Sequence, residues 1–247
     1  MYKVIFIIPV ILIFICIWLT TRKVYESFSN HLPSIQFIVL KNYKNRVHNV
    51  HELINKEGIQ NYTIFDAIDG SRQNRLQLMR DGKLNKNTNS LRLGVIGCSL
   101  SHITIWKQFI KSSNGDLLIL EDDINLANNF NKQLSLVMRH LPTDYDICYL
   151  QERKNLDQRF KNTPINKYIR SGWPQYGTIG YLISKKGAKR LLTYCDPIYQ
   201  AIDVMISDVV KRRDIKCYIT RENLVSHTYK FTSVVCGVGK HCKPSIT

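Results

Sequence analysis

The chain has 247 residues, of which 44% are hydrophobic, and its formal net charge is +16. About two hundred residues follow an apolar amino-terminal segment, which is enough for one domain with a sizeable core. We find no internal repeat, and no CxxC pair occurs among the seven Cys, so neither a repeat array nor a zinc site is expected. The Lys and Arg residues are scattered, with no basic run longer than Lys211-Arg212-Arg213, so no nucleic-acid partner is expected.

The amino terminus carries an apolar run from Val4 to Leu19, which Thr20 and Thr21 extend. A membrane-spanning helix needs roughly 17–25 residues, and the extended run reaches that range. No pattern of small residues follows it, so an uncleaved anchor is favoured over a cleaved signal peptide. We therefore expect a single-pass membrane protein that is anchored by residues 1–21.

The anchor leads into a polar stem over residues 22–34, and the remaining residues, 35–247, form one domain. The charges on the two sides of the anchor are nearly balanced. A cytoplasmic amino terminus is preferred, which places the domain in the lumen. In that compartment a disulfide between Cys236 and Cys242 is the expected pairing, because the two flank a short loop.

The first half of the domain alternates strand and helix patterns. Ile35 to Leu40 reads as a strand, and the helix predicted over 44–57 ends at Gly58. A short strand begins at Thr63. A polar loop is expected over 81–92, and apolar residues at helical spacing predict an amphipathic helix over 94–112.

The second half continues the alternation after a strand that ends in acids at Glu121. Further strands are predicted over 146–150, 177–184 and 215–219, and helices over 127–141, 185–194 and 201–210. The segment 151–174 is basic and weakly patterned. This alternation predicts an α/β layered domain.

The most informative segment is Asp116 to Asp123, in which four aliphatic residues are followed by Glu121, Asp122 and Asp123. The aliphatic part indicates a strand buried on both faces, and open α/β sheets bind ligands at the carboxyl ends of such strands. Three adjacent carboxylates need a compensating cation or water, and a hard divalent cation bound to phosphate meets that need. The alternative is a solvated acidic turn that caps the next helix.

Four segments, in their order and spacing, resemble glycosyltransferase family 25, the group of lipooligosaccharide and procollagen sugar transferases. They cover about 170 residues: Ala67 to Gly70, Gly94 to His102 with Trp106, Leu118 to Asp123, and Gly180 to Leu192 with Asp203 downstream. The resemblance implies a single GT-A-like nucleotide-sugar-binding domain with a mostly parallel central sheet. It also implies Mn²⁺ or another divalent cation, and transfer with inversion at the anomeric carbon.

The resemblance assigns the chemistry to acidic residues and one histidine. Asp123 is the expected direct metal ligand, and Asp122 and Glu121 supply a second ligand, a ribose contact or a contact to metal-bound water. By analogy with other GT-A enzymes, His227 completes the metal site, although a surface or core histidine is the alternative. Asp203 is the expected base for the acceptor hydroxyl, and its alternative is an ordinary acid in the first turn of a helix.

The remaining assignments concern the two substrates. The residues expected at the donor are Arg46, Asp69, Gly97, His102 and Gly180, and those expected at the acceptor are Trp173 and Tyr176. Close packing is the alternative for both glycines, as a helix cap is for His102. The chain departs from the family pattern in its first strand, where Lys41-Asn42 follows in place of the usual acid, so the usual contacts to base and ribose are not carried over.

The sequence thus predicts a membrane-anchored hexosyltransferase that moves galactose or glucose from a UDP-sugar to a glycan, glycolipid or protein hydroxyl. Two alternatives stay open. One is a catalytically inactive relative that binds glycan or a partner. The other is a basic, membrane-tethered nucleic-acid-binding protein, which the net charge keeps in consideration.

Overall fold

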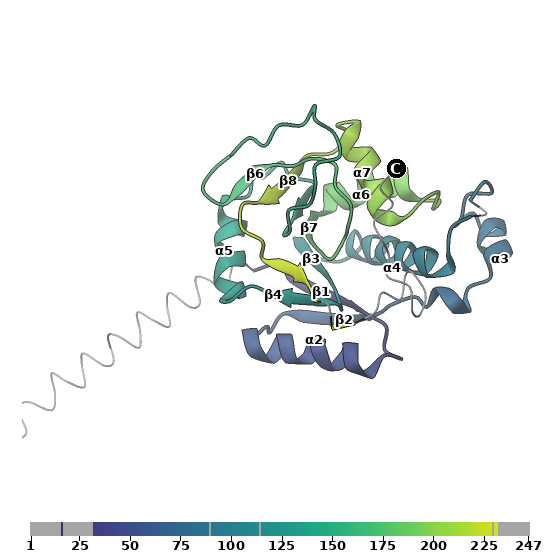
Figure 1. Cartoon of the computed structure of the whole chain (residues 1–247), viewed down its shortest axis with the longest axis horizontal. Helices are drawn as coiled ribbons and strands as arrows, with labels where there is room; N and C mark the ends of the chain where they lie inside the picture. The colour runs from purple at the N-terminus through teal and green to yellow at the C-terminus, as the bar shows by residue number, and fades with distance from the viewer. Residues whose placement is uncertain (1–15, 17–31, 89, 114, 229, 232–247) are drawn as a thin grey trace, which may run out of the picture.

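The computed structural model describes residues 16, 32–88, 90–113, 115–228 and 230–231 (Figure 1). Apart from Cys16, the predicted anchor over 1–21 lies outside these residues, as do Cys236 and Cys242. Within the described part, no helix is both long enough and apolar enough to cross a membrane. Cys98, Cys148, Cys195 and Cys217 are free thiols.

The first half of the domain contains four strands and three α-helices. In chain order they are β1 (Ser34–Val39), α2 (Lys44–Glu57), β2 (Tyr62–Asp66), the 3-10 turn η1 (Gly70–Arg72), α3 (Arg75–Arg80), α4 (Leu93–Phe109), β3 (Asp116–Glu121) and β4 (Ile124–Leu126). Helix α2 ends at Gly58, whose left-handed backbone lets its N–H bond back to the last turn, as the sequence predicted.

The second half contains five strands and three helices. They are α5 (Phe130–His140), β5 (Ile147–Tyr149), β6 (Ile169–Ser171), β7 (Gly180–Ser184), α6 (Lys185–Cys195), α7 (Ile202–Lys211), β8 (Cys217–Thr220) and β9 (Val225–His227). The sequence did not predict α3, β4, β6 or β9. Each of these strands has only three residues, which is too short for a period-2 pattern to register.

The main sheet has seven strands in the order β2-β1-β3-β7-β5-β8-β6, and β4 and β9 form a separate antiparallel pair. Five strands run in one direction, whereas β6 and β7 run in the other. The predicted α/β class with a mostly parallel sheet is therefore confirmed for strand direction. The antiparallel position of β7 beside β3 is a feature that the sequence did not reveal.

Helices cover both faces of the sheet (Figure 1). Helices α4, α6 and α7 pack on one face with Ile119 of β3, and α2 and α5 pack on the other with Leu118 and Leu120. Because side chains alternate along a strand, β3 contributes to both cores and is buried throughout its aliphatic part. This burial fixes the strand whose carboxyl end carries the acids.

Candidate active site

The three acids at the end of β3 have different surroundings. The strand hydrogen-bonds to β1 on one side and to β7 on the other, and the Glu121 N–H still donates to the Ile179 carbonyl at 2.9 Å. Beyond this bond the chain leaves the main sheet and enters β4. Successive side chains there point in different directions, so each carboxylate meets its own set of partners.

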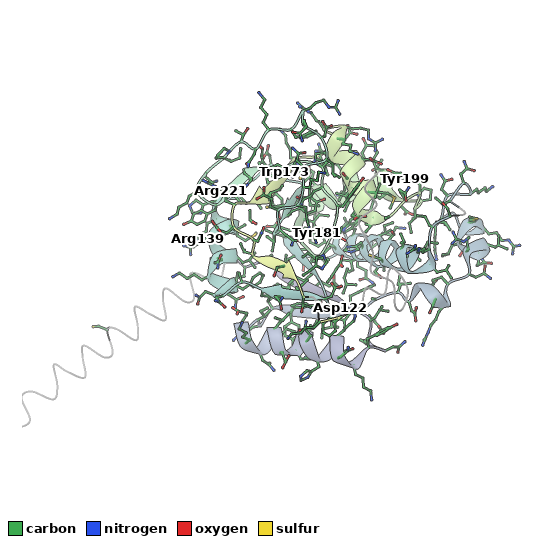
Figure 2. All side chains as sticks on the ribbon, viewed as in Figure 1. Asp122, Arg139, Trp173, Tyr181, Tyr199 and Arg221 are labelled. Atoms are coloured by element: carbon green, nitrogen blue, oxygen red, sulfur yellow. The ribbon has the colours of Figure 1, made fainter. Side chains whose placement is uncertain are left out.

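Asp122 is turned inward and is 5% exposed. Its Oδ1 accepts a close hydrogen bond from the guanidinium of Arg46, which is equally buried, and its Oδ2 accepts from the Leu40 N–H at 3.3 Å. The Asn49 side chain donates to the Asp122 carbonyl at 3.1 Å. Burial raises the pKa of the Asp122 carboxyl, and the Arg46 charge opposes that shift. Asp122 therefore anchors the strand end on helix α2, near which Figure 2 shows it.

Arg46→Ala is expected to lower the free energy of unfolding by about 3–5 kcal/mol, because it leaves the buried Asp122 carboxylate without its counter-charge. Urea denaturation at neutral pH measures the change. The double variant with Asp122→Asn is expected to recover much of the loss, since it removes the orphaned charge. Equal stability of the single and the double variant would contradict this account.

Asp123 lies between Arg46, which it shares with Asp122, and His227 of the β4–β9 pair. Its Oδ1 is buried and has no hydrogen-bond partner among the described residues. The closest cationic atoms are His227 Nδ1, at 3.9 Å from Oδ1, and the Arg46 guanidinium nitrogen, at 3.7 Å from Oδ2. Pairing of β4 with β9 brings His227 to this place, because His227 is the register partner of Ile124.

The electrostatics of Asp123 and His227 suit a bound cation. Burial, with the neighbouring Glu121 charge, raises the pKa of Asp123 to about 7. Burial and the Arg153 charge lower the pKa of His227, which favours the neutral ring with a free lone pair. A buried carboxylate oxygen without a partner, beside a neutral imidazole, fits a divalent cation.

Asp123→Asn is expected to stabilise the protein in the absence of divalent cations, by roughly 1–3 kcal/mol at pH 8. The folded-state pKa of Asp123 lies above its unfolded value, so its ionisation costs stability. The cost is absent below pH 4, grows as the pH rises to about 7 and stays constant above it. Urea denaturation at pH 4 and pH 8 with a chelator measures it, and an equal gain at both values would refute the assignment.

Glu121 interacts with His102 of helix α4 and with Thr178, which lies just before strand β7. Thr178 Oγ1 donates to its Oε1 at 2.6 Å, and His102 Nε2 lies 3.5 Å from the same oxygen. Burial raises the pKa of Glu121, but the interactions with His102 and Thr178 outweigh it, and the net direction is down. Glu121 is therefore held as a carboxylate that is fixed in one orientation.

His102 belongs to a buried hydrogen-bond chain across helix α4 and strand β7. The Trp106 indole N–H donates to the Tyr181 hydroxyl at 3.0 Å, and that hydroxyl lies 2.8 Å from His102 Nδ1. The hydroxyl hydrogen can then bond to Nδ1, which leaves the ring proton on Nε2, facing Glu121. Figure 2 shows Tyr181 near the middle of the sheet. His102 Nδ1 thus has a hydrogen-bond partner, whereas the buried Nε2 has none among the described residues and lies 3.5 Å from Glu121 Oε1.

The side chains of Cys98, His102 and Glu121 form a second group whose ligand atoms all lie within 4.8 Å of one another. Burial raises the pKa of the Cys98 thiol well above its usual range, so the thiol stays protonated. With the Tyr181 hydroxyl hydrogen on Nδ1, His102 Nε2 carries the ring proton and has no lone pair to offer a metal. Metal binding by this group would require the Cys98 thiol to lose its proton, whereas Asp123 offers a carboxylate oxygen without a partner among the described residues.

Asp203 lies in the first turn of helix α7, which packs on the same face of the sheet as helix α4. Its Oδ2 accepts from the Gly177 N–H at 2.9 Å, and its Oδ1 accepts from the N–H of Val204 at 2.8 Å. Burial raises the pKa of Asp203 and the Glu121 charge adds to the rise, while these backbone hydrogen bonds oppose it. Gly177 and Thr178, adjacent in the chain, thus connect Asp203 and Glu121.

Asp69 lies in a neighbouring pocket at the carboxyl ends of β1 and β2. Its Oδ1 caps η1 by accepting from the Ser71 N–H at 2.9 Å, and its Oδ2 lies 3.4 Å from Arg72 Nε. The pocket has a volume of about 300 Å³, and its lining also includes Leu40 and Lys41. Leu40 contacts Asp122 through its backbone, so the pocket adjoins the acidic strand end.

The two predicted donor glycines occupy packing positions. A Cβ on Gly97 would lie 2.4 Å from the Ile68 carbonyl oxygen, because helix α4 crosses that loop closely. A Cβ on Gly180 would lie 2.9 Å from a methyl carbon of Val225. Each glycine therefore has a steric reason in the fold, which was the alternative considered from the sequence.

The predicted acceptor residues differ in exposure. Trp173 is 3% exposed and its indole N–H donates to the Arg153 carbonyl at 3.0 Å, so its ring offers little surface to a sugar. Trp173 therefore packs mainly in the core, well apart from Asp122 (Figure 2), and it also lines a pocket with Arg153, so its acceptor role stays a prediction. Tyr176 is 42% exposed and precedes Gly177, so it remains accessible beside the site.

Sequence reasoning missed three residues that touch this site: Arg153, Thr178 and Tyr181. Thr178 and Tyr181 lie on either side of Gly180. The only sequence signal for Thr178 is that it is a polar residue just before an apolar strand. Arg153 lies in the weakly patterned segment and gave no signal. All three come to the site through the antiparallel placement of β7 and the turn after β5.

Comparisons with known proteins match most of the domain. The sequence profile described as "Glycosyltransferase family 25 (LPS biosynthesis protein)" matches residues 33–206. Procollagen galactosyltransferase 1-A of Xenopus laevis is 30% identical over 155 residues, which cover 58% of this chain and 25% of that protein. Procollagen galactosyltransferase 2 of Homo sapiens is 29% identical over 169 residues, covering 64% and 27%.

Other similarities are weaker. A protein of Rattus norvegicus named "Probable inactive glycosyltransferase 25 family member 3" is 26% identical over 152 residues, covering 57% of this chain and 26% of its own. A crystal structure of a glycosyltransferase involved in glycosylating the major capsid of PBCV-1 aligns with a TM-score of 0.42 and 10% identity, covering 81% of this chain and 95% of that one. The chain spans about a quarter of the length of the curated relatives it matches. Because the family profile covers most of the domain, the chain belongs to glycosyltransferase family 25.

Proposed function

We propose that the chain is a metal-dependent, inverting glycosyltransferase that moves a hexose, galactose or glucose, from a UDP-sugar to a hydroxyl of a glycan, glycolipid or protein. One observation carries the proposal: the buried Asp123 Oδ1, without a partner among the described residues, faces His227 at the end of the central strand. Family membership supports the reaction class. The relatives named procollagen galactosyltransferase support galactose as the first sugar to test.

Asp123 and His227 are the residues proposed to hold Mn²⁺ or another divalent cation. When bound there, the cation would neutralise charge that develops on the leaving diphosphate. Asp122, which is ion-paired with Arg46, keeps the strand end in place. Glu121, held by Thr178 and His102, presents a fixed carboxylate toward the donor or toward water around the cation.

Asp203 is proposed to accept the proton of the attacking hydroxyl. Burial raises its pKa, which makes it a stronger base than an exposed carboxylate. Two backbone N–H groups fix its orientation. The acceptor would approach beside Tyr176, from the side opposite the departing diphosphate.

The pocket beside Asp69 is proposed to hold the nucleoside of the donor. It lies where two parallel strands end, next to the acids, which is the usual ligand position in open α/β sheets. Its lining by Lys41 and Asn42 replaces the acid of the family pattern, so contacts to base and ribose differ from those of other members.

The test is calorimetric titration of UDP with and without Mn²⁺, followed by a screen of UDP-sugars for slow hydrolysis. Hydrolysis reports catalysis without knowledge of the acceptor. Metal-dependent UDP binding with hydrolysis of one UDP-hexose supports the proposal. Binding without hydrolysis of any UDP-sugar would favour a catalytically inactive relative, and absence of binding would reject the proposal.

A further inference from the structure

Arg153 has a backbone that two buried side chains hold in place. Its N–H donates to Gln175 Oε1 at 2.9 Å, and its carbonyl accepts from the Trp173 indole at 3.0 Å. Gln175 is 1% exposed and Trp173 is 3% exposed. The segment after β5 is thus fixed at this residue, although most of its neighbours are surface residues.

The Arg153 side chain is also oriented. Its Nε donates to Gln151 Oε1 at 2.9 Å, and the Gln175 amide donates to the Gln151 carbonyl at 2.9 Å. Among the described residues, neither Nη nitrogen has a hydrogen-bond or ion-pair partner. A guanidinium that is fixed through Nε and free at both Nη atoms presents a two-pronged donor, which matches a phosphate or carboxylate.

The guanidinium lies beside the proposed reacting groups. A Cβ on Gly177 would stand 3.7 Å from both Nε and Nη2 of Arg153, and the Gly177 N–H donates to Asp203. Gly177 has φ of +99°, a conformation that favours glycine and leaves this face of the loop open. The Arg153 charge also contributes to the lowered pKa of His227. Arg153 therefore lies beside the loop whose Gly177 N–H holds the proposed base.

We infer that Arg153 is an oxyanion-binding residue of this site, and that its two Nη groups hold a phosphate oxygen pair of the donor diphosphate. The inference rests on the proposed function for the identity of the donor. A carboxylate of an acidic acceptor sugar offers the same chemistry. The position beside Gly177 favours the diphosphate, because the adjacent Thr178 holds Glu121 at the strand end where the cation site is proposed.

Arg153 also lines a pocket that could hold an acceptor. A pocket of about 560 Å³ continues from Arg153 along Lys154, Asn155 and Asn162. Glu152, the acid of this pocket, is neutralised by Arg170 at 3.1 Å. The pocket is therefore net positive, and an acidic sugar is the second source that the experiment must separate from the diphosphate.

The test compares Arg153→Gln and Arg153→Lys with the native chain by calorimetry, using UDP with Mn²⁺, uridine, and methyl glucuronide as probes. For UDP, Arg153→Gln is expected to weaken binding about ten- to a hundredfold, and Arg153→Lys to weaken it less, because lysine keeps the charge but lacks the fork. Uridine, which has no phosphate, should bind all three alike. Arg159→Gln is the matched control, since Arg159 pairs with Asp157 on the surface of the same segment.

The outcomes separate the alternatives. A loss confined to UDP supports the diphosphate, and a loss confined to methyl glucuronide assigns the same residue to the acceptor carboxylate. Unchanged binding of both probes by Arg153→Gln overturns the inference, provided that circular dichroism shows a folded protein. If the native chain binds no UDP, the proposed function fails, and the methyl glucuronide titration still decides whether Arg153 binds an oxyanion.

Discussion

Asp123→Ala is expected to lower the Mn²⁺-dependent affinity for UDP by about two orders of magnitude or more and to abolish UDP-sugar hydrolysis. The reason is geometric. Asp123 supplies the buried oxygen that faces His227, and neither Asp122 nor Glu121 can replace it. Asp122 is occupied by Arg46, and Glu121 is occupied by Thr178 and His102.

Calorimetry with and without Mn²⁺ measures the effect, and urea denaturation shows that the variant is folded. Asp116→Asn is the matched control, because Asp116 lies at the opposite end of the same strand and bonds to the Tyr145 hydroxyl. Its UDP affinity should equal that of the native chain. If Asp123→Ala keeps full metal-dependent binding, Asp123 is not a metal ligand, and the proposed cation site has to be abandoned.

Asp203→Asn is expected to reduce sugar transfer about 10²- to 10⁴-fold while UDP binding stays within about twofold of the native value. Asparagine has nearly the same shape and keeps one oxygen that can accept from a backbone N–H, but it cannot take up the proton of the acceptor. The backbone bonds of Asp203 to Gly177 and Val204 show where its two oxygens lie.

The measurement is transfer rate and UDP affinity on the same preparation, with Asp208→Asn as the control. Asp208 lies on the same helix and pairs with Lys211 at its surface, so its replacement should change neither quantity. The rate of the native chain should also fall at acidic pH, because the proton would occupy Asp203 there. A variant that transfers normally but binds UDP poorly would place Asp203 at the donor instead.

Local pattern predicted the features that depend on a single segment. The aliphatic run before Glu121 indicated a strand buried on both faces, and β3 has that burial. The helix over 44–57 has the predicted bounds, because Gly58 supplies the left-handed residue that ends it. Alternation of such elements was enough to predict the α/β class.

Contacts between distant segments could not be predicted in the same way. Arg46 and Asp122 are 76 residues apart, and their pairing depends on β1 lying next to β3. Thr178 reaches Glu121 only because β7 runs antiparallel beside β3. Strand order is set by the packing of whole layers, and no local period encodes it.

The sequence by itself determined that three carboxylates end a buried central strand, because four aliphatic residues before them leave that strand no exposed face. Only the tertiary structure decided which acid keeps a buried oxygen without a partner among the described residues. Side chains of neighbouring residues diverge at a strand end, and their partners come from α2, β9 and the loop before β7. The placement of those elements pairs Asp122 with Arg46, lets Thr178 donate to Glu121, and leaves Asp123 next to His227.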